Sequence, residues 1–300
     1  MNVVTGAFGY IGRYITRELL SRGQRVRTIT THPDKPNPFG PKVNAFPYHF
    51  ENPEKLTAQL DGVEKLFNTY YIRFEHGGVT FDQAVANTQI LFECARRAGV
   101  QKIVHIGVTN SDPDDELAYY RGKARQERAL RNMDVDHTVL RPTLVYGVED
   151  ILVNNIAWLI RHFPIFPIFG SGEYRLQPVF VGDLAQIAVD VAGREGAEAF
   201  DVIGQETYTF KSFVRKIVDE LSPATQMIHV PPRLGQAMGK PIGWLMGDVL
   251  LTWDELKGLM REKLTSEGAP QTETNFSDWL REHKDELGMA YTSELGRHFY

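Results

Sequence analysis

The sequence of 300 residues has only one cysteine, Cys94, and lacks any run of the roughly eighteen apolar residues that would cross a bilayer. A single cysteine excludes an internal disulfide and argues against a cysteine-based metal cluster. The nine histidines show no metal-ligand spacing, and the apolar stretch at the N-terminus is too short for a signal peptide. We therefore expect no metal site, no membrane span and a cytoplasmic protein.

An excess of positive charge is also lacking. Lysine and arginine number 33 against 38 aspartates and glutamates, which gives a formal net charge of −5. Surfaces that bind nucleic acid are normally basic, so nucleic acid is not expected as a partner. The apolar content of 42% is ordinary for a globular enzyme. The length suffices for one large α/β domain, or for a nucleotide domain with a smaller lobe.

The sequence does contain a glycine-rich turn between a strand-like segment and a helix-like segment. Residues 2–5 form a short apolar run that leads into Gly6-Ala7-Phe8-Gly9-Tyr10-Ile11-Gly12, and an apolar pattern of helical spacing follows. Gly23 is placed to end that helix, and residues 24–30 read as a second strand. This order predicts a βαβ unit whose turn offers backbone N–H groups and a helix N-terminus to a pyrophosphate.

Strand-like and helix-like segments alternate through the first half of the chain, with strands expected at 43–46, 65–70, 102–106 and 137–140 and a long helix at 81–98. Such alternation predicts an α/β fold with a parallel sheet that helices cover on both faces. We expect residues 1–147 to form the dinucleotide-binding domain and 148–300 to be mostly a smaller, helical substrate lobe.

Three segments of the second half are harder to assign. The prolines of Phe163–Phe169 predict an apolar loop. Residues 199–203 and 227–230 are strand-like, and they either return to the main sheet or pair locally.

Tyr119 and Lys123 are four residues apart in a helical stretch, so the phenol and the amine share one helix face. A neighbouring ammonium lowers the pKa of a phenol, which suits Tyr119 to exchange a proton with a substrate. Thr109 follows the strand 102–106, at the sheet edge where catalytic groups of this architecture gather. It is the preferred carbonyl-polarising hydroxyl, with Ser111 as the runner-up, and Tyr120 is the alternative phenol.

Further landmarks occur in a fixed order after the glycine turn: Asn87, Tyr119 with Lys123, Arg141–Gly147 and Phe180–Ala185. Over roughly residues 1–205 the chain resembles the extended short-chain dehydrogenase/reductase superfamily. It is most similar to the atypical, epimerase/dehydratase-like branch, which includes NmrA-like regulators and the NAD(P)H-binding accessory subunit of respiratory complex I.

The resemblance implies an α/β fold of Rossmann type, with a doubly wound parallel sheet, in which NAD or NADP binds at the turn. The residues expected to line its site are Gly6, Phe8, Gly9, Tyr10, Ile11, Gly12, Thr30, Thr31, Asn68, Thr69, Asn87 and Lys123. It also implies a catalytic set in which Thr109 holds the substrate oxygen, Tyr119 exchanges a proton and Lys123 lowers the pKa of the tyrosine. The predicted function is NAD(P)-dependent oxidation, reduction or epimerisation of a small molecule. The alternative is a non-catalytic NAD(P)-binding sensor or assembly subunit, and a homo-oligomer is left open.

The end of the second strand departs from the usual NAD pattern. NAD binders place an acidic residue there for the ribose 2′-hydroxyl, whereas this chain has Thr30 and Thr31, with Asp34 beyond a proline. A 2′-phosphate would meet no repulsion, and Arg13, Arg27 or Lys35 are candidates to bind it. The sequence thus favours NADP slightly over NAD.

Several other residues have two interpretations. Bulky Tyr70 and Tyr71 follow the fourth strand, where the family has smaller residues, and either narrow the pocket or form part of the core. His105, inside an apolar strand, is read as a core histidine and not as a catalyst. Asn154 and Asn155 are secondary candidates for substrate contact. Residues Tyr291–Tyr300 either dock on the chain itself or bind a partner.

Overall fold

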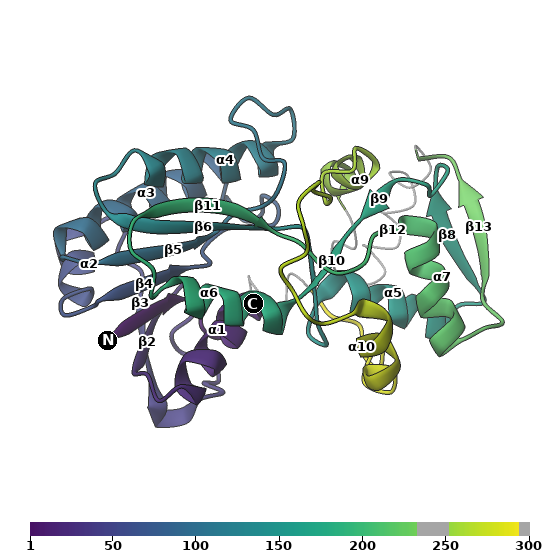
Figure 1. Cartoon of the computed structure of the whole chain (residues 1–300), viewed down its shortest axis with the longest axis horizontal. Helices are drawn as coiled ribbons and strands as arrows, with labels where there is room; N and C mark the ends of the chain where they lie inside the picture. Colours follow the sequence, from purple (N-terminus) through teal and green to yellow (C-terminus); the bar gives the residue numbers. More distant parts are fainter. Residues whose placement is uncertain (233–251, 294–300) are drawn as a thin grey trace. The chain divides into compact units, whose positions relative to one another are not determined.

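The computed structural model describes residues 1–232 and 252–293. The chain forms two compact units, each assembled from separate stretches of sequence (Figure 1). The first unit comprises Met1–Pro142 and Val181–Asp201, and the second comprises Thr143–Phe180 and Val202–Tyr300. The sequence landmarks of a dinucleotide site up to Arg141 therefore lie in the first unit.

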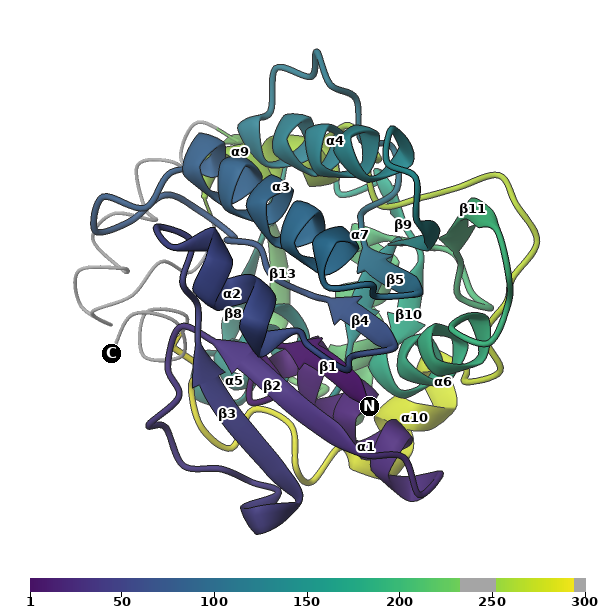
Figure 2. The same cartoon turned by 90° about the vertical axis from the view of Figure 1, so that its left-hand side faces the viewer.

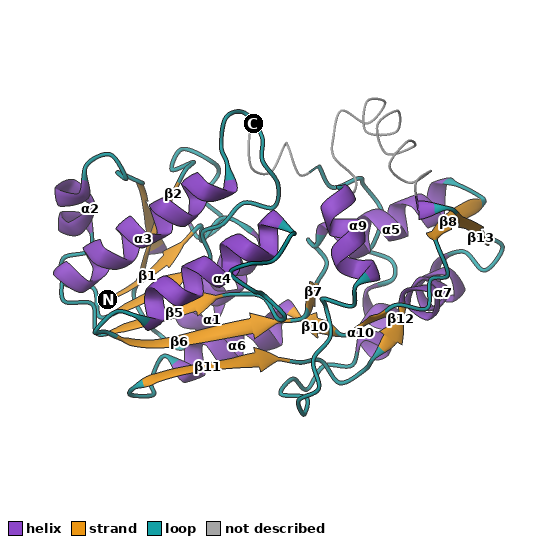
Figure 3. Cartoon of the chain, turned by 90° about the horizontal axis from the view of Figure 1, so that it is seen from above, coloured by secondary structure: helices purple, strands orange, loops and turns teal. Residues whose placement is uncertain are grey.

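The first unit is built on a seven-stranded sheet with the order β11-β6-β5-β4-β1-β2-β3. All pairs from β6 to β3 are parallel, and β11 lies beside β6 (Figure 3). The strands are β1 (Asn2–Thr5), β2 (Val26–Thr30), β3 (Val43–Pro47), β4 (Lys65–Asn68), β5 (Lys102–Ile106), β6 (Asp136–Pro142) and β11 (Ala197–Val202).

Helices cover both faces of this sheet (Figure 2). On one face α1 (Tyr10–Ser21) packs beside α6 (Val181–Val191), and on the other α3 (Phe81–Arg97) packs between α2 (Pro53–Gln59) and α4 (Ala118–Arg131). A short 3₁₀ helix, η1 (Gly40–Lys42), precedes β3. The predicted Rossmann-type fold with a doubly wound parallel sheet is confirmed.

The first βαβ unit forms as its sequence predicts. Helix α1 buries Gly12, Ile15, Thr16 and Leu19 against the sheet. It ends at Gly23, whose φ of +71° is a left-handed conformation that glycine adopts without steric cost. The N–H groups of Gly23 and Gln24 then bond back to the carbonyls of Leu20 and Leu19, both at 3.0 Å. This closure satisfies carbonyls that the helix end would otherwise leave unpaired.

The second unit combines helices with short strand pairs around an aromatic core. Tyr146, Phe213, Phe276 and Trp279 are buried at its centre. Strand β7 pairs with β10, β9 with β12, and β8 with β13. The elements are β7 (Leu144–Tyr146), α5 (Ile151–His162), β8 (Ile165–Phe169), β9 (Arg175–Leu176), β10 (Pro178–Phe180), β12 (Tyr208–Thr209), α7 (Phe210–Leu221), β13 (Gln226–Val230), α9 (Trp253–Met260) and α10 (Phe276–His283).

The prediction of a loop at Phe163–Phe169 is wrong, because Ile165–Phe169 is strand β8, parallel to β13. Phe166 and Ile168 alternate into the core while Ile165 stays exposed. Within residues 1–232 and 252–293 β8 pairs with β13 alone. A strand paired on one side has an unpaired edge, where proline, which lacks an N–H, is tolerated. Of the two unassigned segments, the first joins the main sheet as β11 and the second pairs locally as β13.

None of the helices within residues 1–232 and 252–293 combines the length and the apolar character needed to cross a membrane. The same residues contain no group of three or more histidine, cysteine, aspartate and glutamate side chains arranged to hold a metal ion. Cys94 is a buried free thiol whose Sγ contacts the carbonyl of Pro53 at 3.3 Å.

Candidate functional site

The glycine turn follows β1 directly and is closed by its own backbone. Gly6 has a φ of +63°, and its carbonyl accepts a hydrogen bond of 2.8 Å from the N–H of Gly9. A Cβ added at Gly12 would lie 2.3 Å from the carbonyl oxygen of Gly6, and one at Gly9 would lie 3.2 Å from the same atom. The start of α1 therefore approaches the turn so closely that position 12 accepts only glycine.

The turn leaves the N-terminus of α1 without a capping side chain. Gly9 is the N-cap and has no side chain to accept from the first helical turn, which also contains no acidic residue. Tyr10 and Ile11 open the helix, and the carbonyl of Phe8 accepts a 3.1 Å hydrogen bond from Arg13. The positive end of the helix dipole is thus uncompensated by any acid of its own, which is the property of a phosphate-binding helix terminus.

Threonine side chains bind the turn to the end of β4. The Oγ1 of Thr69 donates to the carbonyl of Thr5 at 2.6 Å, and the N–H of Thr69 donates to the Oγ1 of Thr5 at 2.7 Å. Thr5 in turn donates to Oδ1 of Asn68 at 3.1 Å. Asn68 is fully buried, and its amide holds Thr5, the residue that precedes the turn. The Oγ1 of Thr69 lies 3.6 Å from the position of a Cβ on Gly6.

His105 completes this buried chain of hydrogen bonds from the neighbouring strand β5. Oδ1 of Asn68 also accepts from the N–H of Tyr70 at 3.2 Å, so the NH₂ group of the amide must face Nδ1 of His105, 3.0 Å away. Nδ1 is then an acceptor and Nε2 carries the proton. Burial lowers the pKa of His105 well below its ordinary value. A neutral core histidine, as the sequence indicated, is the result.

At the end of β2 the two candidate threonines differ. Thr30 is buried, and its hydroxyl accepts from the N–H of His32 at 3.3 Å, whereas Thr31 is exposed. Arg27 donates to the carbonyl of Gln59 at 3.1 Å and is therefore held at β2. Arg13 is the basic candidate that lies on the glycine turn itself, through its bond to Phe8.

Asn87 and Tyr70 form a second polar contact at the exit of β4. The amide of Asn87 donates to the phenol oxygen of Tyr70 at 2.9 Å. The Tyr70 ring packs against Tyr48 and Phe50, with centroids 5.0 and 5.3 Å away. Asn87 thus fixes an aromatic cluster at the ends of β3 and β4.

Lys123 points into the unit from α4 and is only 6% exposed. Its amino group donates to the carbonyl of Ile106, the last residue of β5, at 2.8 Å. It also lies 4.7 Å from the centroid of the Tyr71 ring. Burial lowers the pKa of Lys123 to about 7, so an amine poised between its two protonation states stands at the carboxyl end of β5.

Tyr119 lies in the first turn of α4, among aromatic rings. Its ring centroid is 5.4 Å from that of Tyr71 and 6.3 Å from that of Phe81. Its backbone carbonyl accepts a hydrogen bond of 3.2 Å from the hydroxyl of Tyr71. The alternative phenol, Tyr120, is buried in a small cluster with Val108 and Leu117.

Thr109 follows β5 as expected, but it is fully buried, and its hydroxyl donates to Oδ2 of Asp201 at 2.9 Å. The other oxygen of Asp201 lies 3.7 Å from Arg141, whose guanidinium also forms a bidentate pair with Glu127. Sequence reasoning did not find this network. An acidic residue near the end of the strand-like run 199–203 was its only signal.

The structure therefore gathers Gly6, Gly9, Gly12, Asn68 and Thr69 at one point, the carboxyl ends of β1 and β4. It places the other candidates with separate partners. Thr109 binds Asp201 and Lys123 binds Ile106, and within the described residues no hydrogen bond joins Thr109 to Lys123.

In the second unit, Asn154 and Asn155 hold the C-terminal segment of the chain. Asn155 accepts from the N–H of Thr292 at 2.9 Å and donates to its carbonyl at 3.1 Å, and Asn154 accepts from the N–H of Gly288 at 2.9 Å. Their amides are used by the chain itself, which does not favour a substrate role. Up to residue 293 this segment docks on its own chain, and residues 294–300 lie outside the described part.

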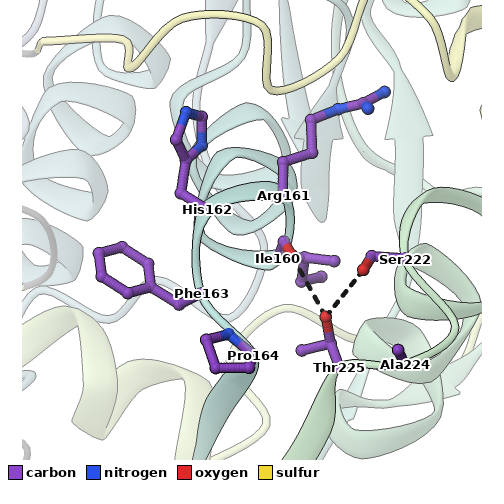
Figure 4. A pocket seen from close by; sticks show the side chains of 8 residues that line it. All are labelled: Ile160, Arg161, His162, Phe163, Pro164, Ser222, Ala224 and Thr225. Atoms are coloured by element: carbon purple, nitrogen blue, oxygen red, sulfur yellow. Dashed lines mark hydrogen bonds between the residues drawn. The ribbon is translucent and has the colours of Figure 1, made fainter.

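A hollow of about 190 Å³ lies at the C-terminal end of α5 (Figure 4). Thr225 on its wall bonds to Ser222 and to the carbonyl of Ile160, both at 3.2 Å. The hollow is open, small and part of the second unit, and it contains none of the predicted site residues. We do not assign the dinucleotide site to it.

Residues 6–150 match a protein-family model described as NAD(P)H-binding. Over 285 residues the chain is 20% identical to the mitochondrial NADH dehydrogenase [ubiquinone] 1 alpha subcomplex subunit 9 of Arabidopsis thaliana, covering 89% of this chain and 71% of that protein. It is 30% identical over 264 residues to sterol demethylase protein B of Methylococcus capsulatus, covering 79% of each.

Solved structures share the fold at low sequence identity. The triphenylmethane reductase of Citrobacter sp. complexed with NADP(H) has a TM-score of 0.71 and 18% identity, covering 94% of this chain and 99% of that one. A dTDP-glucose 4,6-dehydratase variant from Streptomyces venezuelae with NAD bound has a TM-score of 0.68 and 19% identity, covering 99% and 98%.

Proposed function

Since this chain belongs to the extended and atypical short-chain dehydrogenase/reductase superfamily of NAD(P)-binding proteins, we propose that it binds NAD or NADP at the turn of residues 6–12. We further propose that it uses the dinucleotide to oxidise, reduce or epimerise a small molecule. The small-molecule substrate and the cytoplasmic location stay predictions.

One observation carries the binding proposal, namely the close approach of Gly12 to the carbonyl of Gly6. It brings the turn of residues 6–12 tightly against the start of α1, at a helix N-terminus without a cap or an acid. A pyrophosphate fits such a site because backbone N–H groups and the helix dipole both attract negative charge. Thr5 donates to Asn68 and accepts from the N–H of Thr69, and these bonds hold the turn to the end of β4.

When bound, the dinucleotide would supply or accept a hydride. Tyr119 would exchange the accompanying proton with the substrate oxygen, as the resemblance implies. Lys123 is buried beside the end of β5 and has further N–H groups beyond the one that bonds to Ile106. Such a group suits a ribose hydroxyl. Thr109 would hold the substrate oxygen only if its hydroxyl were released from Asp201.

That last requirement favours a second candidate function, a protein that binds the dinucleotide without turnover. A fully buried Thr109 that already donates to a carboxylate has no proton free for a substrate carbonyl. Relatives that carry the name of a NADH dehydrogenase subunit agree with this second candidate.

The decisive experiment is a titration of the purified protein with NADH and with NADPH, in which the fluorescence of the cofactor reports binding. We expect binding by the parent chain and its loss in Gly12→Ala, because the added Cβ must displace the backbone of Gly6. Gly193→Ala is the matched control, since its Cβ meets nothing nearer than 3.6 Å. Failure of the parent to bind either cofactor would exclude both functions. Turnover of carbonyl or sugar-nucleotide substrates then separates the first from the second.

A further inference from the structure

Tyr71, three residues after β4, makes a contact that the structure of the glycine turn does not require. Tyr71 lies against α4, where its hydroxyl donates to the carbonyl of Tyr119 at 3.2 Å. Its ring also contacts Phe81 at the start of α3, with 5.8 Å between centroids. The side chain thus spans from the exit of β4 to the first turns of two helices.

Gly122 makes this arrangement possible. A Cβ at position 122 would lie 1.9 Å from the hydroxyl oxygen of Tyr71 and 3.0 Å from its Cζ. Gly122 is in the interior of α4 and has no positive φ, so the backbone does not require glycine there. Glycine in a helix interior costs roughly 1 kcal/mol relative to alanine. The space that the Tyr71 side chain needs explains why glycine occupies this position despite that cost.

The next residue along the helix is Lys123, whose amino group lies 4.7 Å from the centroid of the Tyr71 ring. The amine also bonds to Ile106, and His105 is the neighbouring titratable group in β5. The ring of Tyr71 and the carbonyl of Ile106 are therefore both in contact with the amine. A neutral His105 places no positive charge beside it.

We propose that Tyr71 is the positioning residue for Lys123, holding its amino group against the carbonyl of Ile106 and excluding water from it, and that Gly122 provides the space for this ring. The inference rests on the proposed function, in which Lys123 contacts the bound dinucleotide. An amine that is already immobilised loses little freedom on binding, so the free energy of dinucleotide binding is more favourable.

The test is a measurement of the pKa of the Lys123 amine by NMR, in protein with isotope-labelled lysine. The signal of Lys123 is identified as the one that is lost in Lys123→Arg. The parent amine should titrate near 7, the value that its burial produces. Tyr71→Leu removes the ring, and Gly122→Ala displaces it. In both variants water reaches the amine, and its pKa should rise toward 10.5, the ordinary value for lysine.

A double-mutant cycle makes the geometry itself testable. Tyr71→Phe keeps the ring and removes the oxygen that a Cβ at position 122 would strike. The titration of Lys123 should therefore stay close to the parent in Tyr71→Phe, and Gly122→Ala should perturb it much less in that background than in the parent. Dinucleotide affinity should fall roughly threefold to tenfold in Tyr71→Leu, the cost of immobilising one long side chain at binding.

An unchanged titration of Lys123 in Tyr71→Leu overturns the proposal, as does an equal effect of Gly122→Ala in both backgrounds. If Gly122→Ala does not fold, the comparison of Tyr71→Leu with Tyr71→Phe decides. The NMR titration needs no cofactor. A parent chain that bound no dinucleotide would therefore refute the proposed function and still report on Tyr71.

Discussion

The amide of Asn68 donates a hydrogen bond of 3.0 Å to Nδ1 of His105, and the two residues face each other in register on β4 and β5. The contact requires a neutral imidazole, because a protonated ring has no lone pair with which to accept. A single protonation in the core would thus break the chain of hydrogen bonds that reaches the glycine turn through Thr5.

This contact predicts a loss of stability in acid. Burial lowers the pKa of His105 below its ordinary value of 6.5, so the unfolded chain binds the proton more readily. The stability that the neutral ring contributes is complete above pH 6.5 and is lost as the pH falls, by about 1.4 kcal/mol per pH unit. In His105→Gln the free energy of unfolding, measured with urea from pH 7 to 5, should fall less steeply.

The control is His229→Gln, at an exposed position of β13, which should leave the slope unchanged. At pH 7 the glutamine variant should be less stable by about 1–3 kcal/mol, because the NH₂ group of Asn68 loses the acceptor that Nδ1 of His105 provides. Parallel curves for His105→Gln and the parent would contradict the assignment.

The bond from Thr109 to Asp201 predicts a difference between two replacements. Thr109→Val removes the hydroxyl that donates to the half-buried carboxylate of Asp201 and should lower the free energy of unfolding by about 1–3 kcal/mol. Thr109→Ser keeps the hydroxyl and should lose much less. Urea denaturation at pH 7 measures both, and a larger loss in Thr109→Ser than in Thr109→Val would mean that the methyl group, and not the hydrogen bond, stabilises this position.

The C-terminal segment depends on Gly288, whose φ is +68° and whose added Cβ would lie 2.5 Å from the backbone of Ala157 and Trp158. Gly23 has a similar φ of +71° with nothing within 4 Å of an added Cβ. Gly23→Ala should therefore cost roughly 1 kcal/mol for the left-handed backbone alone. Gly288→Ala should cost about 1–3 kcal/mol more, because the segment must lift from α5.

Limited proteolysis provides a second measurement for the same pair. The bonds from Asn154 and Asn155 hold residues 288–292 against α5, so cleavage there should be faster in Gly288→Ala than in Gly23→Ala. Equal stability and equal cleavage of the two variants would show that the close approach to α5 is not kept in solution.

The NADP preference that we predict from the sequence implies a selective effect at Arg13. Its guanidinium is bonded to Phe8 on the turn, close to where a dinucleotide would lie. Arg13→Gln should weaken NADPH binding by about tenfold or more, the worth of a hydrogen bond between charged groups, and change NADH binding little. Arg27→Gln is the control because Gln59 already holds Arg27. An equal loss of both cofactors would leave Arg13 no role at the 2′-phosphate.

Much of the first unit could be predicted from sequence because its signals are local. The order of strand, Gly6 to Gly12 and helix depends on residues within one βαβ unit, and Gly23 ends α1 through neighbouring carbonyls. The burial of Lys123 was not predictable, since it depends on Tyr71, which is 52 residues away in sequence and is held by the space at Gly122.

Strand β8 and the network at Thr109 show two further reasons. The prolines of β8 carry the signal of a loop, and only a partner such as β13 makes a strand of them. Asp201 reaches Thr109 across 92 positions of sequence, because β11 returns to the sheet after the chain has built part of the second unit. Pairings of this kind leave no periodicity to detect.

The return of β11 also orders the events of synthesis. Strand β6 ends at Pro142, but its outer neighbour is Ala197–Val202, and residues 143–180 belong to the other unit. While the chain is being synthesised, β6 is an unpaired edge strand, and Arg141 lacks the carboxylate of Asp201. Unpaired edge strands can pair with other chains and aggregate. We expect a fragment that stops at Pro142 to aggregate and one that extends through Val202 to be more soluble, so that β11 acts in the nascent chain as a protecting strand.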